Sequence, residues 1–201
     1  MPNKLKHAYG FWFDQLLTDF ICQHKCETES EEEYASRNGF FITLNFDTNA
    51  VASRKRSLHD QNETARSIEL WNTNHLYNLL CNKLIGRNFL KAKNHNRLPK
   101  MIACVDVNGT RHWHSMGEVQ NIHIHTIWML PSDLTEKFKT ALNEIDLSRF
   151  DFRQIDVQPI TSLKNNRSGP STLSSYTGKF LGFNNHNLEV SEDIMIYPRA
   201  R

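Results

Sequence analysis

The chain has 201 residues, which is enough for one domain with a substantial hydrophobic core. It is 39% hydrophobic and 23% charged, as ordinary soluble globular proteins are. It has no run of 18 apolar residues and no signal-peptide cleavage site, and its four cysteines lack the spacing of a disulfide framework. We therefore expect a cytoplasmic protein with no membrane partner.

The formal net charge of +2 is a weak argument for nucleic-acid binding, but the charges are unevenly distributed. The segment 27–33 (ETESEEE) holds five glutamates, so the rest of the chain has an excess of about seven positive charges. The segments 53–57 and 87–100 are basic, and the second has five Lys or Arg and no acid. Basic segments alternating with Asn and aromatic residues are typical of a surface that binds phosphates, although solvated loops have the same composition.

The first half of the chain predicts a helix, a strand and a second helix. Residues 4–24 have apolar positions at helical spacing, namely Phe11, Phe13, Leu16, Leu17, Phe20 and Ile21. The acidic run is predicted to be a linker. Residues 39–46 (GFFITLNF) are predicted to form a strand with Phe41, Thr43 and Asn45 on one face. Residues 47–63 read as a loop. The helix expected at 64–85 ends at Gly86, and its core-facing residues are Ile68, Trp71, Leu76, Leu79, Leu80 and Leu84.

The second half predicts strands at 100–107, 121–130 and 153–160. A helix is expected from 132, where Asp133 and Glu136 resemble a capping box and Leu134, Phe138 and Leu142 share a face. A basic loop then leads to a short helix at 172–182, and the tail from 184 is polar apart from one apolar stretch near 193–198. This order of elements predicts an α+β fold, with a central antiparallel sheet and flanking helices in one domain.

Two histidines interrupt the apolar strand 121–130 (NIHIHTIWML). The two-residue period places His123 and His125 on the same face, with Cα atoms about 6.5–7 Å apart. Burying an imidazole without a partner costs on the order of 1–3 kcal/mol, so two neighbouring rings need a shared explanation. Each could be an ordinary satisfied histidine, or both could bind one metal ion.

Asp106 is the candidate third ligand. If 109–120 forms the loop between two antiparallel strands, Asp106 lies directly opposite His123 and on the same face. A slip of one residue would turn it away, in which case Glu118 and His114 are the alternatives. Two imidazoles and a carboxylate suit Mg²⁺ or Mn²⁺ acting on a phosphate, and Zn²⁺ would also bind.

Two other groups of residues suggest zinc more weakly. The segment 111–114 (RHWH) is a second His-x-His pair, but its polar surroundings predict a loop. Cys22, His24 and Cys26 lie close together on the first expected helix, without a second pair of ligands.

Tyr176 and Lys179 are three residues apart, and so share one face of the short helix expected at 172–182. A tyrosine has a pKa of about 10, so forming tyrosinate at pH 7 costs roughly 4 kcal/mol. A nearby ammonium group would lower that cost, which makes Tyr176 a candidate nucleophile and Lys179 its assisting cation.

Three segments in this order, FFITLNF, HIHTIWMLP and YTGKFLG, resemble the motifs of the HUH endonucleases, specifically of the single-tyrosine rolling-circle replication initiators. The resemblance covers about residues 39–183. It implies a ferredoxin-like or RRM-like antiparallel sheet with a metal site on its open face. It also implies cleavage of single-stranded DNA by tyrosine attack, leaving a 5′-phosphotyrosine and a free 3′-OH. The domain would comprise an N-terminal helix and acidic linker (1–36), a catalytic core (37–183) and a tail (184–201).

Carried over to this chain, the resemblance makes His123, His125 and Asp106 the ligands of Mg²⁺ or Mn²⁺, and Tyr176 and Lys179 the catalytic residues. Thr43 and Asn45 would lie near the DNA. Basic residues that would follow its backbone are Lys91, Lys93, Arg97, Lys164 and Arg167. The partner would be single-stranded DNA at an origin or in a hairpin, and a host helicase would act in trans, because the chain ends too soon for a fused one.

Several alternatives stay open. Relaxases of this superfamily place the tyrosine before the histidines, which argues against one, and Phe180 stands where a two-tyrosine enzyme has its second tyrosine. A single-tyrosine transposase of the same superfamily is the nearest alternative, although Phe180 also replaces the polar metal ligand usual there. A non-catalytic module that binds single-stranded nucleic acid and a structural zinc protein are the alternatives from other classes.

Overall fold

The computed structural model describes residues 2–60, 68–107, 122–163, 169–179, 181 and 194–199. Its α-helices are α1 (Pro2–His24), α2 (Glu31–Asn38), α3 (Thr48–Asp60), α4 (Ile68–Ile85), α5 (Thr135–Asn143) and α6 (Thr172–Thr177). Its strands are β1 (Gly39–Phe46), β2 (Lys100–Val107), β3 (Ile122–Met129), β4 (Phe152–Pro159) and β5 (Ile194–Tyr197). Short 3₁₀ turns are η1 (Ala92–Arg97), η3 (Ser132–Leu134) and η4 (Leu147–Arg149).

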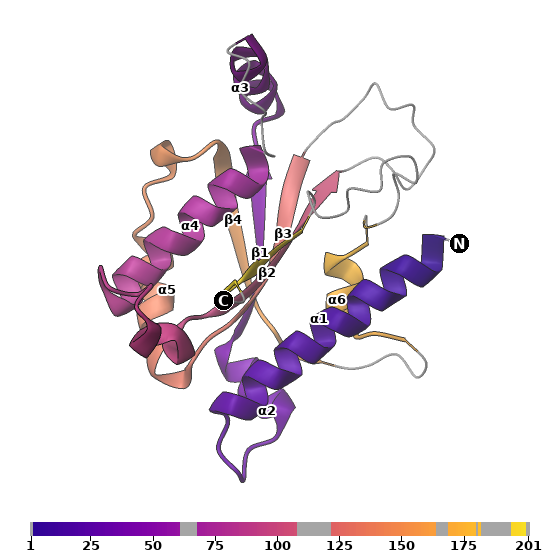
Figure 1. The fold of residues 1–201 in the computed structure, drawn as a ribbon, viewed down its shortest axis with the longest axis vertical. Coiled ribbons are helices and arrows are strands. Elements are labelled where there is room, and N and C mark those ends of the chain that lie inside the picture. Colours follow the sequence, from indigo (N-terminus) through magenta and orange to yellow (C-terminus); the bar gives the residue numbers. More distant parts are fainter. Residues whose placement is uncertain are drawn as a thin grey trace.

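The strands form a five-stranded antiparallel sheet in the order β4-β1-β3-β2-β5. Helices α4 and α5 lie on one side of this sheet, and α1 and α6 lie on the other (Figure 1). The predicted α+β class with an antiparallel sheet and flanking helices is therefore confirmed, and the arrangement is compatible with a ferredoxin-like fold. Among the described helices, none has the combination of length and apolar character that crossing a membrane requires.

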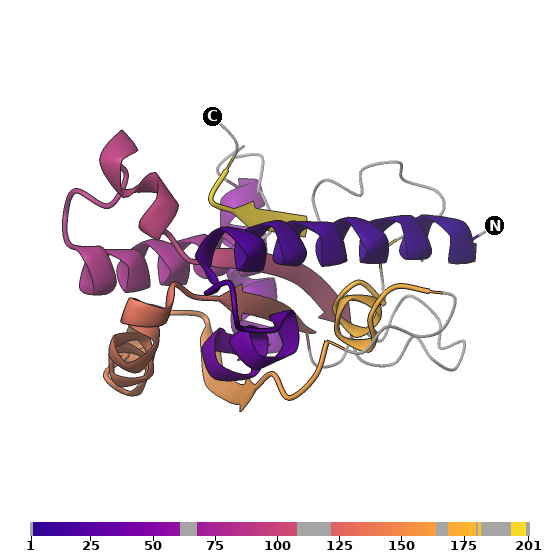
Figure 2. The same ribbon diagram turned by 90° about the horizontal axis from the view of Figure 1, so that it is seen from below.

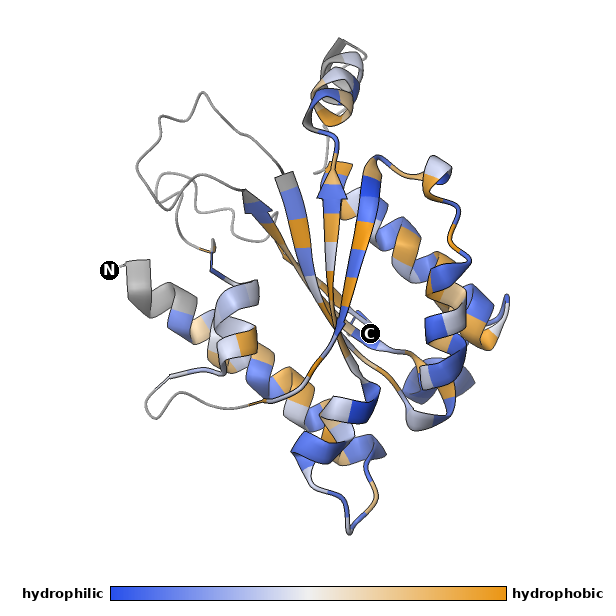
Figure 3. Ribbon diagram, turned by 180° about the vertical axis from the view of Figure 1, so that it is seen from behind, coloured by the Kyte–Doolittle hydropathy of each residue, from blue (hydrophilic) through white to orange (hydrophobic). Residues whose placement is uncertain are grey.

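Two hydrophobic clusters lie on the two faces of the sheet, and alternating residues of β2, β3 and β5 contribute to both. The alternation is visible when the ribbon is coloured by hydropathy (Figure 3). On β3, Ile124 and Trp128 pack with α4 and α5, whereas Ile127 and Met129 pack with α1 and α2. The faces predicted for this strand are thus correct. The histidines lie on the α1 side.

Four expectations about local structure are wrong. The acidic run is not only a linker, because its last three glutamates begin α2. Ser30 and Glu33 form a reciprocal capping box there, which satisfies backbone N–H groups at the start of the helix. Residues 48–60, expected to be part of a loop, are helix α3. The carboxylate of Asp47 accepts hydrogen bonds from the backbone N–H groups of Asn49 and Ala50, which caps this helix.

The expected capping box of Asp133 and Glu136 does not form. The 3₁₀ turn η3 precedes α5, so Leu134 occupies the N-cap position and makes no side-chain cap. The helix expected at 172–182 is shorter, because α6 ends at Thr177 with Gly178 as its C-cap, so Lys179 lies just beyond the helix. The tail, for which no element was predicted, adds a strand, since β5 pairs with the outer side of β2.

Two side chains expected in the core are exposed. Trp71 is 48% exposed and Phe11 is 51% exposed. The ring of Trp71 instead stacks on His75 and has the guanidinium of Arg54 4.9 Å from its centroid. The other helix positions with a predicted inward face, such as Phe13, Leu76 and Phe138, are buried, except Leu16 and Leu79, which are half-buried.

Candidate metal centre and neighbouring tyrosine

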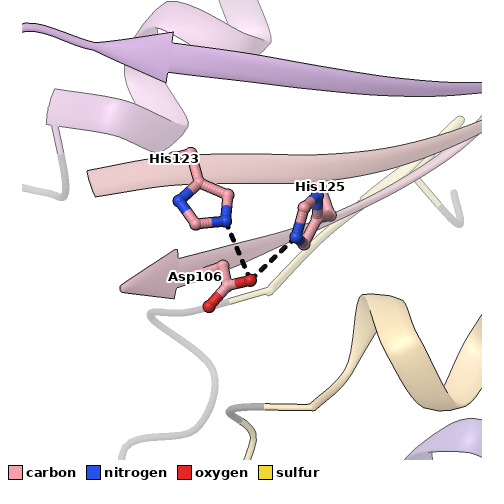
Figure 4. Close-up of side chains that lie close together, drawn as sticks. All are labelled: Asp106, His123 and His125. Atoms are coloured by element: carbon pink, nitrogen blue, oxygen red, sulfur yellow. Dashed lines mark ion pairs between the residues drawn. The ribbon is translucent and has the colours of Figure 1, made fainter. Parts of the chain in front are cut away.

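Asp106, His123 and His125 meet on the α1 side of the sheet (Figure 4). Strands β2 and β3 pair so that Asp106 lies directly opposite His123, which is the register predicted from the sequence. The Oδ2 atom of Asp106 is 2.9 Å from Nε2 of His123 and 2.7 Å from Nε2 of His125. One ligand atom from each residue lies within 4.8 Å of the other two. The three side chains could therefore hold a metal ion.

The burial of this cluster supports that interpretation. Asp106 is fully buried and His125 is 3% exposed. Oδ2 of Asp106 makes short contacts with both rings and with the ammonium group of Lys179. Within the described residues, Oδ1 of Asp106 and Nε2 of His125 have no hydrogen-bond partner of acceptable geometry. Buried polar atoms without such partners are costly. A cation bound between the carboxylate and the rings would satisfy all of them, so the donor set fits a metal ion.

The electrostatics favour the protonation states that bind metals. Burial acts to raise the pKa of Asp106, but its contacts with His123, His125 and Lys179 outweigh that effect and hold the pKa well below its ordinary value. Burial lowers the pKa of His125, although the carboxylate of Asp106 partly opposes this shift. Asp106 is therefore ionised and the ring of His125 is neutral near pH 7, as metal coordination requires.

Thr43 supports His125 from the neighbouring strand. The pairing of β1 with β3 places Thr43 opposite His125 and Asn45 opposite His123. The hydroxyl oxygen of Thr43 is 3.2 Å from Nδ1 of His125. With the proton on Nδ1, this hydroxyl accepts it, and the lone pair of Nε2 is directed toward the carboxylate of Asp106. The hydroxyl of Thr43 can therefore support the tautomer of His125 that binds a cation through Nε2.

Tyr176 and Lys179 lie beside this cluster. The ring centroid of Tyr176 is 4.9 Å from that of His125, and the tyrosine is 43% exposed. The Nζ atom of Lys179 is 2.5 Å from Oδ2 of Asp106 and 4.3 Å from the centroid of the Tyr176 ring. The structure therefore brings together the five residues that the sequence indicated as metal ligands, nucleophile and assisting cation.

A cavity of about 780 Å³ opens next to the cluster. One side is lined by Phe41, Thr43, Asn45, His123, His125 and Tyr176. The other side is lined by Asp156 and Gln158 of β4, the segment 159–162, Thr172 and Leu173. This volume is within the range of small-molecule sites. The two histidines and the tyrosine face the same space, which a substrate can enter.

The other residues expected to contact DNA are placed differently. Thr43 and Asn45 line the cavity, as expected of residues near a substrate. Lys91, Lys93 and Arg97 precede β2, and lie at the end of the sheet opposite Asp106. Five residues of strand lie between Lys100 and Asp106, which are roughly 20 Å apart, and this basic segment is not among the residues that line the cavity. Lys164, Arg167 and Phe180, and the alternative ligands Glu118 and His114 with the loop 108–120, lie outside the described residues.

The structure does not bring Cys22, His24 and Cys26 together as a metal site. Both cysteines are free and exposed. Each ring nitrogen of His24 is 2.8 Å from a backbone carbonyl oxygen, one from Phe20 and one from Asn96. In the part of the chain that the structure describes, Asp106, His123 and His125 form the one group of three or more metal-ligating side chains.

Sequence reasoning missed two residues at this site. Phe41 packs against both His125, with ring centroids 5.2 Å apart, and Tyr176, with centroids 5.8 Å apart. Its position on the same strand face as Thr43 was a signal that could have found it. Asp14 of α1 accepts hydrogen bonds from the start of α6. A contact between residues 157 positions apart has no local sequence signal.

Comparisons of the chain with protein-family models, with curated proteins and with solved structures give no match. The candidate function therefore depends on the residues and geometry of the chain itself.

Proposed function

We propose that this protein is a metal-dependent endonuclease and strand transferase that nicks and rejoins single-stranded DNA through Tyr176, as a rolling-circle replication initiator of the HUH type would. One observation carries the proposal. A buried Asp-His-His cluster with unsatisfied ligand atoms adjoins an exposed tyrosine, and a lysine contacts both the cluster and the tyrosine. A structural zinc site does not need such a tyrosine at the mouth of a cavity.

Mg²⁺ or Mn²⁺ is the cofactor that this proposal requires. His123 and His125 would supply two nitrogens and Asp106 an oxygen, leaving other coordination positions for water and a phosphate oxygen. When bound, such an ion withdraws negative charge from the scissile phosphate.

Tyr176 would supply the nucleophile. Its phenolic oxygen attacks the phosphorus, the bond from phosphorus to the 3′ oxygen breaks, and a bond from phosphorus to the tyrosine oxygen forms. The phenolic proton leaves to solvent, and the departing 3′ oxygen takes up a proton to become a 3′-OH. The products are a 5′-phosphotyrosine and a free 3′ end. Attack by a 3′-OH on the phosphotyrosine reverses the step and reseals a strand.

Lys179 would stabilise negative charge that develops during the reaction. Its ammonium group lies 4.3 Å from the centroid of the Tyr176 ring, on a side chain that is only 18% exposed. A cation at that distance in a partly desolvated place stabilises negative charge on the phenolic oxygen more than it would in water. The ionised Asp106 holds Lys179 in this position.

The experiment is incubation of the protein with a pool of single-stranded oligonucleotides and Mn²⁺, followed by denaturing electrophoresis to detect a covalent adduct. We expect the wild-type protein and the control variant Tyr9→Phe to form the adduct. Tyr176→Phe should form none while keeping its affinity for single-stranded DNA. Tyr9 is a suitable control because it lies on α1 and does not line the cavity.

The possible results separate this function from its alternatives. DNA binding without any adduct in the wild-type protein would overturn the enzymatic proposal in favour of a binding module. Unfolding on chelation, without DNA binding, would indicate a structural zinc protein. If an adduct forms, sequencing of the trapped strand tells a replication origin from a transposon end.

A further inference from the structure

Helix α6, which carries Tyr176, is only six residues long. A helix of this length is not stable on its own, because the entropy cost of forming its first turn exceeds the stabilisation from its few hydrogen bonds. The position of Tyr176 therefore depends on what holds α6 in place. In both views of the ribbon, α6 lies beside the N-terminal half of α1 (Figures 1 and 2).

Asp14 of α1 makes the polar connection. Its Oδ2 atom accepts a hydrogen bond from the backbone N–H of Ser171 at 2.7 Å. Its Oδ1 atom accepts hydrogen bonds from the hydroxyl groups of Ser171 at 2.5 Å and Ser174 at 2.7 Å. Ser171 is the N-cap of α6 and accepts a hydrogen bond from the N–H of Ser174. One carboxylate thus fixes the first turn of the helix at three points.

Close packing supports the same connection. A side chain at Gly10 of α1 would approach Pro170, just before α6, to 2.6 Å, so the glycine permits the close approach of the two segments. At the other end of α6, Phe13 lies against Gly178, where a Cβ atom would be 3.3 Å from its ring. Both ends of α6 are therefore set against α1.

We propose that Asp14 is a positioning residue, which holds α6 so that Tyr176 and Lys179 face the metal ligands. This inference rests on the proposed function of Tyr176. The fully buried or nearly buried Phe13, Leu17, Phe20 and Ile21 fix α1 on the sheet independently of Asp14. Loss of the carboxylate consequently releases α6 and leaves α1 and the metal ligands in place.

The test compares Asp14→Asn with the matched control Asp19→Asn. Asparagine presents an NH₂ group where Asp14 presents a second acceptor, so it cannot receive all three hydrogen bonds. Asp19 lies on the same helix and accepts a hydrogen bond from the exposed side chain of Gln15. The measurements are the single-turnover rate of adduct formation at saturating single-stranded DNA, the DNA concentration for half-maximal rate, the Mn²⁺ affinity and amide hydrogen exchange.

We expect Asp14→Asn to lower the maximal rate by at least about tenfold, toward the roughly 100-fold that a misplacement of about 1 Å can cost. The half-saturating DNA concentration and the Mn²⁺ affinity should stay within about twofold of wild type. The amides of Ser175 in α6 and of Gly178, its C-cap, should exchange faster, while those of α1 should not. Asp14→Glu, which keeps the charge, should recover part of the rate.

Two results would overturn the inference. The first is a wild-type rate in Asp14→Asn. The second is a loss of rate accompanied by equal losses of Mn²⁺ affinity and of amide protection across the sheet, which would make Asp14 a general structural residue. Absence of adduct in wild type and in Asp19→Asn would instead count against the proposed function, and the exchange of the α6 amides would still report on Asp14.

Discussion

The sheet face toward α1 has two halves that differ in their chemistry. In one half, Ile102, Ile127 and Met129 are fully buried beneath α1 and α2. In the other half, which uses the same strands, His123 and His125 border an open cavity and Asp106 is buried behind them. Only one residue of β3, Thr126, lies between His125 and Ile127. A buried apolar residue at position 125 would stabilise the fold more than a histidine does. The change in polarity therefore indicates that this part of the sheet is a functional site.

The largest expected effect comes from the polar half. Asp106→Asn removes the anionic ligand, and should lower Mn²⁺-dependent adduct formation by at least about 1,000-fold, because a bound metal contributes several kcal/mol to such a reaction. Titration calorimetry should show the loss of Mn²⁺ binding directly. Asp156→Asn is the control, since Asp156 lines the cavity but lies outside the cluster. Wild-type Mn²⁺ affinity in Asp106→Asn would rule out this metal site.

A substitution in the apolar half should reduce stability and leave metal binding unchanged. Ile127→Ala leaves a cavity in a fully buried position, and should lower the free energy of unfolding by about 2–5 kcal/mol. Mn²⁺ affinity should not change, because the ligands and their backbone pairing are retained. Urea denaturation and calorimetry measure the two quantities. Val157→Ala, at a position that is 40% exposed, should have little effect on either. A loss of Mn²⁺ affinity in Ile127→Ala would show that the two halves are coupled.

A smaller effect is expected from the strand next to the polar half. Thr43→Val keeps the shape of the side chain but removes the hydroxyl that contacts Nδ1 of His125. Loss of such a supporting group typically reduces metal affinity about 10–100-fold. The comparison is with Thr161→Val, which changes the cavity lining away from the ligands. Equal Mn²⁺ affinities in the two variants would mean that Thr43 does not orient the ring.

The central strands could be predicted from the sequence because each has a two-residue alternation that a buried sheet requires. The loop length then predicted the pairing of Asp106 with His123, which is confirmed. The neighbours of β3 could not be predicted in this way. Period-two patterns do not specify which distant strands pair, so the contact of Thr43 with His125 was not foreseen.

The two helices that were not predicted, α2 and α3, have local capping residues, but their highly charged composition resembles that of a linker or loop. Helix α2 begins in an acidic run that resembles a solvated linker, yet Ser30 and Glu33 have the spacing of a capping box. Helix α3 follows Asp47 in a basic, polar segment with few apolar positions, of which Val51 is buried. Trp71 was assigned to the core by helical spacing, but it instead forms an exposed contact with Arg54. Tertiary contacts, and not periodicity, decide such cases.

The smallest effect is expected for Lys179→Met. This substitution distinguishes an effect of Lys179 on metal affinity from its effect on the reaction rate. The ammonium group of Lys179 lies 2.5 Å from Oδ2 of Asp106, so it competes electrostatically with any cation bound by that carboxylate. Lys179→Met should therefore raise Mn²⁺ affinity by about fivefold, which corresponds to the ~1 kcal/mol between unit charges about 4 Å apart in water. The same change should slow adduct formation, because the reaction loses the ammonium group that lies 4.3 Å from the centroid of the Tyr176 ring.

Lys83→Met is the control, since Lys83 pairs with Glu144 on the other side of the sheet and should change neither quantity. The opposite signs of the two effects make the prediction specific. A residue that only stabilises the fold would weaken metal binding and catalysis together when it is removed. If Lys179→Met loses Mn²⁺ affinity as well as rate, Lys179 holds Asp106 in place for the metal. The polar half of the sheet would then depend on α6 for its own geometry, much as the apolar half depends on α1.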